Sequence, residues 1–411
     1  YCNIESCVMN NGTASGYFPV ERGVRQGDPL SPYLFILVIE LLAIKIQNAP
    51  DIKGITICDD EIKQTIYADD LTGFLADTNS IKALLIILHS FGKVSGLKIN
   101  ADKTEAMGIG ISTGQKHHEI GVRWVNELKI TGIWFTYDAE RRAQLNFDKC
   151  LTRMKSCFHC WSQRDLSIIG KVQIINTFGV SQLLFVTNMI KPPLNFTKDV
   201  NSVLFGFLWN GTEKVKRTAM IAPLEDGGLK MPDLDTVLHT QHVMWVRRFI
   251  CSPEHPWKQC FRWELQKLAG IHSLKCCFHV RSLRTSKITD FYKDVLLGWG
   301  KWSKRPDDAN SVTNQCIWHN KYIVKPNSDA LNYPLLIRKG INYVTDLLDK
   351  NVFMSRIQLE RKGFTELEIW QFHSVLQCLP KEWKAMDFTN FETTSLIQLA
   401  SPLNSKKIYK T

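Results

Sequence analysis

The pattern of apolar and polar positions predicts a helix over residues 31–48, with Ser31 as its N-cap and Pro32 at the first helical position. Short β-rich runs follow at 55–57 and 62–76, and the second run brackets Ala68, Asp69 and Asp70. Because Asp tolerates turn conformations and hydrogen-bonds its own main chain, we expect a hairpin with the two acids at or beside its tip.

The pattern downstream alternates helix and strand. Apolar residues from Ile81 to Phe91 predict an amphipathic helix that begins near Ser80 and ends near Gly92 or Gly96. Residues 97–100 and 104–111 are expected to be two strands, and 127–135 a further strand with a break at Gly132. This alternation favours an α+β fold, with an antiparallel sheet covered by helices on one face.

After about residue 140 the pattern becomes helical. Helices are expected within 151–186, around 200–210 and over 236–250, with Gly- and Pro-rich turns at 216–234. Beyond about residue 285, mixed helices and loops show no clear period, and the function of that part cannot be deduced from the pattern.

Charge divides the chain in the same place. The 411 residues carry a net charge of +11, but residues 1–140 hold 12 Lys and Arg against 17 Asp and Glu, which leaves 39 against 23 for the remainder. The basic part also contains many Trp residues, such as Trp161 and Trp209. Cations interleaved with aromatic rings suit a phosphate backbone with unstacked bases, although basic surfaces and core Trp residues are also common in other proteins.

Cysteine usage and hydropathy indicate the compartment. The twelve cysteines form no even framework, which points to a reducing intracellular environment. Cys150, Cys157 and Cys160 with His159 lack the second half of a zinc finger, so a reduced, partly buried helix is favoured over a zinc site. The longest apolar run, 34–46, contains Glu40 and is too short to cross a bilayer. No secretion signal or transmembrane segment is expected.

Two stretches carry the candidate chemistry. In "IYADDL", Asp69 and Asp70 are adjacent. Two carboxylates so close together repel each other, and one of them resists ionisation unless a cation or open water is near. Upstream, "RGVRQGDPLSP" forms a Gly- and Pro-rich turn leading into the first helix. There Gly27 allows a ligand close to the backbone, and Arg25 and Gln26 offer donors to sugar and phosphate.

With these residues in view, the chain resembles the reverse transcriptases of non-LTR (LINE-type) retrotransposons. The resemblance is carried by "RGVRQGDPLSPYLF", "YADD", "SGLKINADKTEAM" and "ITGIWF", in that order, and by "WSQRDLSIIGKVQIIN", "EDGGLKMPDL" and "GINYVTDLLD" further on. It implies a partial right-hand palm at 1–140, a helical thumb at 141–215 and a mostly helical post-thumb region at 216–411. It also implies an RNA template, a DNA primer, deoxynucleoside triphosphates and access to the nucleus.

The resemblance also implies roles for individual residues in two-metal nucleotidyl transfer, with two Mg²⁺ ions held by carboxylates. Asp69 is expected to be a direct metal ligand and Asp70 a supporting acid. Arg25, Gln26 and Gly27 would line the nucleotide pocket, and Lys103 would be a general acid for the leaving pyrophosphate. The expected nucleic-acid contacts are Tyr67, Gly132, Trp134, Arg164 and Lys171. A solvated turn remains an equal alternative for Lys103, and a plain core strand remains one for Gly132 and Trp134.

One motif of the family has no counterpart. The family carries a further metal-binding Asp in an "F-x-x-D" motif upstream of the turn, and residues 1–21 contain no Asp. We therefore expect a partial chain that lacks the fingers and the first palm motif and is inactive alone. The alternative is a catalytically dead or domesticated remnant that binds nucleic acid. An unrelated metal-dependent hydrolase would need a His or Glu partner arrangement that the sequence does not offer.

Overall fold

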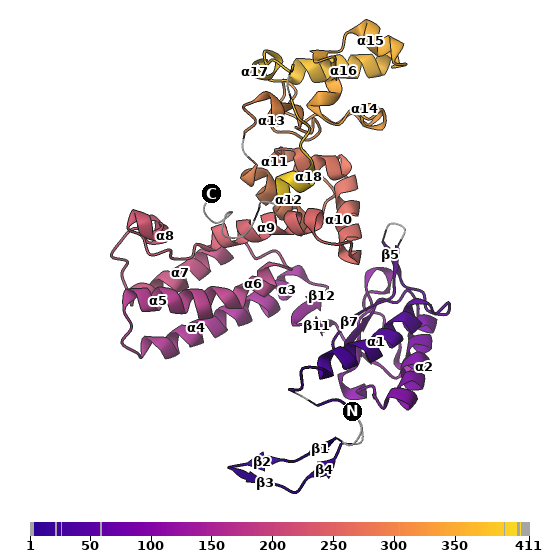
Figure 1. Cartoon of the computed structure of the whole chain (residues 1–411), viewed down its shortest axis with the longest axis vertical. Coiled ribbons are helices and arrows are strands. Elements are labelled where there is room, and N and C mark those ends of the chain that lie inside the picture. Colours follow the sequence, from indigo (N-terminus) through magenta and orange to yellow (C-terminus); the bar gives the residue numbers. More distant parts are fainter. Residues whose placement is uncertain are drawn as a thin grey trace. The chain divides into compact units, whose positions relative to one another are not determined.

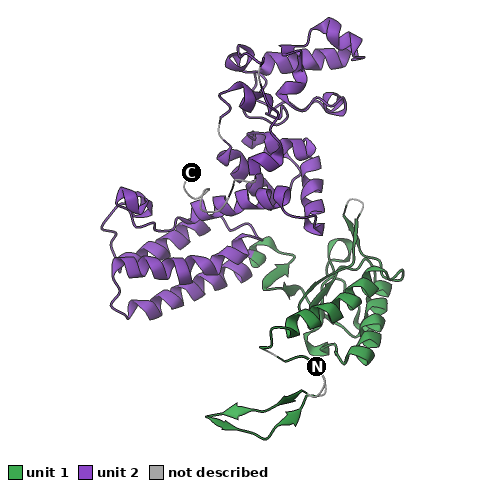
Figure 2. Ribbon diagram, in the orientation of Figure 1, with its two compact units in different colours: residues 1–142 green, residues 143–411 purple. Residues whose placement is uncertain are grey.

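The computed structural model describes residues 4–20, 23–25, 27–57, 60–303, 305–389, 391–400 and 403. The chain divides into two units, residues 1–142 and 143–411, and each is described by itself (Figures 1 and 2). Helices are combined with small, mostly antiparallel sheets of two strands each. The chain is therefore a mixture of α and β structure, as the sequence predicts.

Two helices form the centre of unit 1 (Figure 1). Helix α1 spans Ser31–Gln47 and α2 spans Thr78–Ser95. A small apolar core of Leu42, Ile46, Ile52 and Leu84 lies between them. At such a core each helix buries one apolar stripe, and Phe91 and Leu71 pack against its edge.

The ends of these helices are set by local hydrogen bonds. Leu30, and not Ser31, is the N-cap of α1, because Ser31 is already buried in the first turn, where its hydroxyl donates to Asp28. The predicted cap was wrong by one residue. Asp77 caps α2 by accepting from the Ser80 amide, a bond that lowers the Asp77 pKa. Gly96 ends α2 with a φ of +77°, a backbone conformation that glycine adopts without strain.

The strands that the structure describes in unit 1 pair locally, in separate two-stranded sheets. The pairs β1–β4, β2–β3, β5–β6, β7–β8 and β11–β12 are antiparallel, whereas β9 and β10 are parallel. The strands span Glu5–Ser6 (β1), Met9–Asn10 (β2), Thr13–Ala14 (β3), Phe18–Pro19 (β4), Ile55–Ile57 (β5), Asp60–Ile62 (β6), Gln64–Tyr67 (β7), Asp70–Gly73 (β8), Glu105–Ala106 (β9), Arg123–Trp124 (β10), Glu127–Ile130 (β11) and Ile133–Thr136 (β12).

Three strand predictions were wrong in detail. Residues 97–100 are irregular, and of 104–111 only Glu105–Ala106 is a strand. Residues 127–135 are a hairpin and not one strand, because Thr131 and Gly132 both have positive φ, of +44° and +93°. Two such residues between paired strands make the tight turn whose twist matches that of the strands.

The foot of the β7–β8 hairpin is fastened to the end of α1. Lys63 is 5% exposed, and its Nζ donates to the Ala49 carbonyl at 2.8 Å, while the Gln64 side chain donates to the Ala43 carbonyl at 2.7 Å. A cation is favourable beside the terminal carbonyls of a helix. Glu61, 3.5 Å from Lys63, supplies the opposite charge. These bonds fix where the hairpin leaves the core.

Unit 2 is mostly helical. Two of its longer helices contain a π-helical segment, at Gln144–Asp148 before α4 and at Ile175–Val180 between α5 and α6. The described helices are α3 (Ala139–Ala143, at the boundary), α4 (Lys149–Ser162), α5 (Ile168–Ile174), α6 (Ser181–Thr187), α7 (Phe196–Trp209), α8 (Arg217–Ile221), α9 (Leu234–Cys251), α10 (Pro256–Gln266), α11 (Val280–Thr285), α12 (Asp290–Trp302), α13 (Ala309–Thr313), α14 (Pro334–Arg338), α15 (Arg356–Arg361), α16 (Glu366–Cys378), α17 (Lys381–Lys384) and α18 (Leu396–Ala400).

The helix at Ile168–Thr187 has the length and composition of a membrane span, the only one among the residues that the structure describes. A single helix of this kind is weak support for membrane insertion, since core helices of water-soluble proteins share these properties. Several of its side chains, including Val172, Ile175 and Leu183, are buried within unit 2. Others, including Ile169, Phe178 and Phe185, are exposed, and 33% of the apolar window is buried.

Helices α9 and α12 pack closely because of one glycine. A Cβ on Gly298 would lie 2.7 Å from the Cβ of His242, so only glycine permits this approach. Burial of His242 against α12 lowers its pKa to about 4. The neutral imidazole is therefore the form that the packed helices accommodate.

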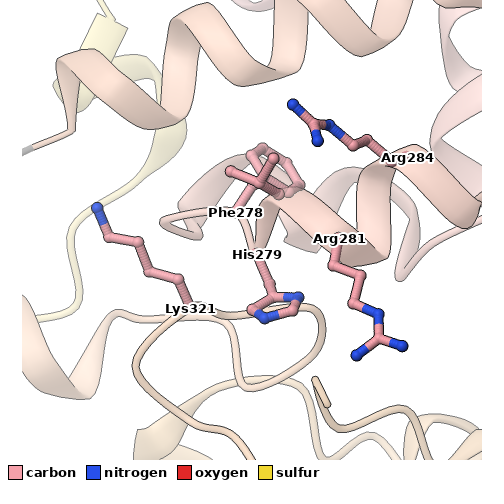
Figure 3. Close-up of a pocket in the computed structure, with 6 residues that line it drawn as sticks. Phe278, His279, Arg281, Arg284 and Lys321 are labelled. Carbon is pink, nitrogen blue, oxygen red and sulfur yellow. The ribbon is translucent and has the colours of Figure 1, made fainter. Parts of the chain in front are cut away.

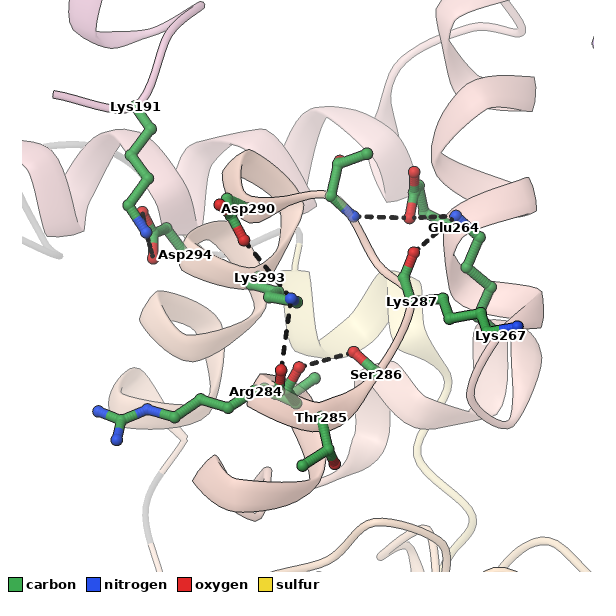
Figure 4. Close-up of polar contacts among 12 residues, drawn as sticks. Lys191, Glu264, Lys267, Arg284, Thr285, Ser286, Lys287, Asp290, Lys293 and Asp294 are labelled. Carbon is green, nitrogen blue, oxygen red and sulfur yellow. Dashed lines mark hydrogen bonds and ion pairs between the residues drawn. The ribbon is translucent and has the colours of Figure 1, made fainter. Parts of the chain in front are cut away.

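A buried carboxylate secures the start of α12 (Figure 4). Glu264, 3% exposed, accepts from Lys267 Nζ at 2.9 Å and from the Thr289 backbone amide at 3.2 Å. Thr289 is the N-cap of α12, whose first amides lack partners within the helix. On the same helix Asp294 pairs with Lys191 at 3.1 Å. These contacts hold α12 to α10 and to the segment that follows α6.

Replacing Lys63 with Met is expected to destabilise unit 1 by about 1–3 kcal/mol, because the Ala49 carbonyl loses its donor. Hydrogen exchange of the backbone amides in residues 64–73 should become faster by the factor that corresponds to this loss of free energy. Lys98→Met removes an exposed lysine of the same unit and is expected to change stability by less than about 0.5 kcal/mol. Equal exchange in the two variants would show that the Lys63 bond does not fasten the hairpin.

Unit 2 is expected to lose stability in mild acid. His242 has a folded pKa of about 4 against 6.5 unfolded, so the unfolded state binds the extra proton between these values. Its contribution is fully present above pH 6.5 and falls by about 3 kcal/mol as the pH drops to 4. Urea unfolding at pH 7 and 4.5 should show a smaller difference for His242→Gln than for the parent chain. His159→Gln, at an exposed site on α4, should leave the difference unchanged, and a similar effect in both variants would refute the assignment.

Candidate functional site

The adjacent acids lie at the tip of the β7–β8 hairpin. Tyr67 pairs with Asp70 across the two strands, so Ala68 and Asp69 form a two-residue turn. Ala68 has a φ of +53°, a left-handed conformation that costs a residue with a Cβ about 1–2 kcal/mol. The surrounding register holds the turn in this form, and such strain at an exposed tip is typical of functional positions.

Exposure changes abruptly along this hairpin. Tyr67 is 72% exposed, and Ala68, Asp69 and Asp70 are exposed as well. One step down, Leu71 is half-buried against the core of α1 and α2. The base of the hairpin is apolar and its acidic tip is exposed to solvent. The carboxylates therefore take no part in packing, and water screens their mutual repulsion.

The carboxylates suit a hard divalent cation but form only part of a ligand set. Mg²⁺ takes oxygen ligands and is commonly held by one or two carboxylates plus water and substrate phosphates, which Asp69 and Asp70 match in type. Within the described residues, no group of three or more His, Cys, Asp or Glu side chains is placed to hold a metal ion. The tip therefore offers two anionic oxygen donors from this chain.

The turn before α1 is open. Gly27 has a φ of +89°, and a Cβ there would meet no atom within 4 Å. Arg25 is exposed, and its carbonyl accepts from the Asp28 amide at 3.4 Å. Gln26 lies outside the described residues. The left-handed glycine thus turns the chain into α1 and leaves backbone accessible on that side.

Two other predicted positions lie on separate elements of unit 1. Lys103 is exposed at the end of a short 3₁₀ turn, Ala101–Lys103, that Asn100 caps at 3.2 Å. Gly132 occupies the β11–β12 turn, and the half-buried Trp134 on β12 lies under Lys129, whose Nζ is 5.8 Å from its ring centroid. Of the residues predicted for the site, the structure brings Tyr67, Asp69 and Asp70 together in one hairpin.

Arg164 and Lys171 belong to unit 2, and their side chains differ in how many contacts they make within the protein. Arg164 is exposed, with its guanidinium 5.0 Å from the centroid of the Trp161 ring. Lys171 Nζ donates to the Leu208 carbonyl at 3.3 Å and to Asn210 at 3.0 Å, where it closes the C-terminal end of α7. One N–H of its ammonium group remains for another acceptor.

The cysteine cluster lies along α4. Cys150 is buried, and burial raises the pKa of both Cys150 and Cys157. The partly buried helix is therefore the interpretation that fits these positions.

Sequence reasoning missed a basic pocket in unit 2. It is lined by Phe278, His279, Val280, Arg281, Arg284 and Lys321 (Figure 3). These residues come from two segments about forty positions apart, 278–284 and Lys321. No local signal in the sequence could have placed them together.

Comparisons with known proteins match the first third of the chain to one family. Residues 2–135 match the model of the family described as reverse transcriptase (RNA-dependent DNA polymerase). This range contains the acidic hairpin, the turn before α1, the Lys103 turn and most of the β11–β12 hairpin.

Similar proteins come from transposable elements. The chain is 22% identical over 390 residues to the "Transposon TX1 uncharacterized 149 kDa protein" of Xenopus laevis. This match covers 89% of the present chain and 29% of the Xenopus protein. It is 37% identical over 134 residues to the "Retrovirus-related Pol polyprotein from type-2 retrotransposable element R2DM" of Drosophila melanogaster, covering 31% of this chain and 12% of that protein. The chain thus spans less than a third of the length of these relatives.

Proposed function

We propose that the chain belongs to the reverse transcriptases of non-LTR retrotransposons and that it supplies part of an RNA-directed DNA polymerase site. The observation that carries the proposal is the exposed pair Asp69 and Asp70 on a tight hairpin inside the matched range. The reaction joins a deoxynucleotide to a primer 3′ end that is paired with an RNA template.

In this proposal the chain's residues bind and orient the reactants. Asp69 would hold a magnesium ion directly, and Asp70 would support it. Bound Mg²⁺ supplies charge neutralisation at the attacking and leaving oxygens. Tyr67, which flanks the acids across the hairpin, would pack beneath the primer terminus. Lys103 would donate a proton to the leaving pyrophosphate.

The remaining predicted residues would position nucleic acid and nucleotide. The turn with Arg25, Gln26 and Gly27 would line the nucleotide pocket, where the open space beside Gly27 supports a close approach to the backbone. Gly132 and Trp134 would grip the primer. Arg164, exposed beside Trp161, is suited to a phosphate or a base, whereas Lys171 retains one free N–H.

We further propose that residues 1–140 are a partial palm, 141–215 a helical thumb and 216–411 a post-thumb region. The change from hairpins to long helices near residue 140 supports this division. The proposal includes access to the nucleus, because elements of this kind must reach chromosomal DNA. Complete catalysis in this scheme requires a further carboxylate in addition to Asp69 and Asp70.

Metal binding at the hairpin can be tested in the chain itself. Fe²⁺ replaces Mg²⁺ at oxygen sites and, with ascorbate and peroxide, generates hydroxyl radicals that cut nearby backbone. We expect cleavage close to 67–70, suppressed by excess Mg²⁺ and reduced on the order of tenfold or more in Asp69→Asn, because a ligand is lost. Mass spectrometry of the fragments locates the cuts.

The matched control for this cleavage is Asp51→Asn, an exposed Asp of the same unit outside the hairpin. It should cleave like the parent chain. Cleavage that persists in Asp69→Asn, or that is lost equally in both variants, would remove the metal from the hairpin tip.

Polymerase activity can be tested by joining the chain to an upstream palm segment of a relative that supplies the "F-x-x-D" Asp. RNA-templated extension of a DNA primer with Mg²⁺ is expected from the joined protein and is expected to be much weaker from the chain alone. Asp69→Asn should lower extension by at least about 100-fold, beyond the usual effect of an outer-sphere partner.

The joined protein also separates the two functions considered for the chain. Asp51→Asn should extend the primer normally. If Asp69→Asn extends equally well, the acid pair is not the catalytic site. If no extension occurs although primer and template bind, the chain is a nucleic-acid-binding remnant and the polymerase proposal is wrong.

A further inference from the structure

The pocket in unit 2 is held by backbone pairing between two distant segments. Phe278 and Asn320 form an antiparallel bridge, the His279 amide donates to the His319 carbonyl at 2.8 Å, and the Lys321 amide donates to the Cys277 carbonyl at 2.8 Å. This short ladder fixes Lys321 on one side of the pocket and the start of α11 on the other. The positions of the cationic side chains are therefore anchored by main-chain bonds.

The pocket has the size and lining of a site for a nucleotide unit. Its volume is about 530 Å³, within the usual range of about 300–1,000 Å³ for small-molecule sites and much larger than a phosphate ion. Phe278 is buried and, with Val280, provides apolar lining. An apolar surface next to cations can accept a base together with its phosphate.

Three cationic side chains surround this lining (Figure 3). Arg281 is paired with Asp329 at 3.4 Å, at exposed positions. Arg284 and Lys321 are exposed, and neither has an acidic partner among the residues that the structure describes. Cations without local carboxylates keep their charge available for an anion that arrives from solution.

The remaining polar group at the pocket is oriented as a donor. His279 Nδ1 accepts from the Ser282 amide at 3.2 Å, so the neutral ring carries its proton on Nε2. In Figure 3 the ring lies between Lys321 and Arg281. A polar group of the bound strand at this place would meet an N–H donor as well as positive charge.

The cationic surface continues beyond the pocket. Lys321 Nζ lies 4.9 Å from the centroid of the Tyr322 ring. The Arg305 guanidinium lies 5.7 Å from the same centroid and is paired with Glu382 at 2.6 Å. Unit 2 as a whole holds 37 Lys and Arg against 23 Asp and Glu, since 14 of the 51 and 17 of the 40 precede Ala143. A polyanion that extends past one nucleotide therefore meets further positive charge.

We propose that this pocket binds single-stranded nucleic acid, with a backbone phosphate between Arg284 and Lys321 and a base on the Phe278–Val280 side. The bases of a duplex are stacked inside the helix and cannot enter a pocket, so the site selects unpaired strands. The inference rests on the proposed function only in taking nucleic acid as the partner. It adds a contact in unit 2 that is separate from the acidic hairpin.

The test is fluorescence anisotropy of the full chain with a labelled twelve-nucleotide oligouridine, without Mg²⁺ or nucleoside triphosphates. The variant Arg284→Gln/Lys321→Gln is expected to lose two phosphate contacts. Each contact contributes about 0.7 to the slope of log K against log salt, which corresponds to roughly 25-fold weaker binding of the double variant at 0.1 M salt. The slope of log K against log salt should become shallower by about 1.4. A labelled oligothymidine tests whether the site distinguishes RNA from DNA, and either strand binding supports the proposal.

The matched control removes the same charge elsewhere in unit 2. Arg361→Gln/Lys362→Gln changes two exposed residues at the end of α15, which lies apart from α11 in Figure 1. It should reduce binding much less than the pocket variant. If the pocket variant loses its folded signal in thermal melts, the single variants Arg284→Gln and Lys321→Gln are measured instead, each with an expected loss of about fivefold.

Three results would overturn the proposal. The pocket variant could bind as tightly as the control variant, a duplex of the same length could bind as tightly as the single strand, or polyglutamate could compete as well as polyuridine at equal charge. The last result would indicate a general anion surface. Arg284→Gln/Lys321→Gln should leave Fe²⁺ cleavage at 67–70 unchanged, so failure of the hairpin site and failure of pocket binding can be told apart.

Discussion

The arrangement of unit 1 depends on one buried cation. Lys63 lies at the junction of the β5–β6 and β7–β8 hairpins, and its ammonium group contacts the carbonyl of Ala49 just past the end of α1. Because the lysine is almost fully buried, its charge requires both this carbonyl and the Glu61 carboxylate. The pair therefore fixes the hairpin to the helix more strictly than apolar contacts alone would do.

From that attachment, the acidic tip follows by geometry. β7 and β8 are four residues long, so the turn at Ala68 and Asp69 stands a fixed distance from the core and is exposed. The left-handed backbone conformation of Ala68 is maintained because the paired strands on both sides fix the turn. A rigid base with an exposed, strained tip is a suitable way to present two carboxylates to a cation shared with a substrate.

Unit 2 applies the same principle with different groups. Glu264 is buried, and it accepts from the backbone amide of Thr289, the N-cap of α12, as well as from Lys267, so the helix start is tied to α10. Close packing of α9 on α12 depends on Gly298, and the burial of His242 between these helices lowers its pKa to about 4. The charges around the basic pocket differ from Glu264, because Arg284 and Lys321 are exposed and lack acidic partners among the described residues. The buried charge of Glu264 thus serves to hold helices together in this unit.

The sequence by itself determined the local features of this protein. The period of apolar residues located α1 and α2, and the Tyr-Ala-Asp-Asp stretch located the hairpin tip, because each depends on residues close together in the chain. Only the tertiary structure decided how the strands pair, where 127–135 folds back at Thr131, and that Lys171 closes α7. It alone joined Lys321 to the start of α11, since main-chain pairing between segments forty residues apart leaves no periodic trace in either one.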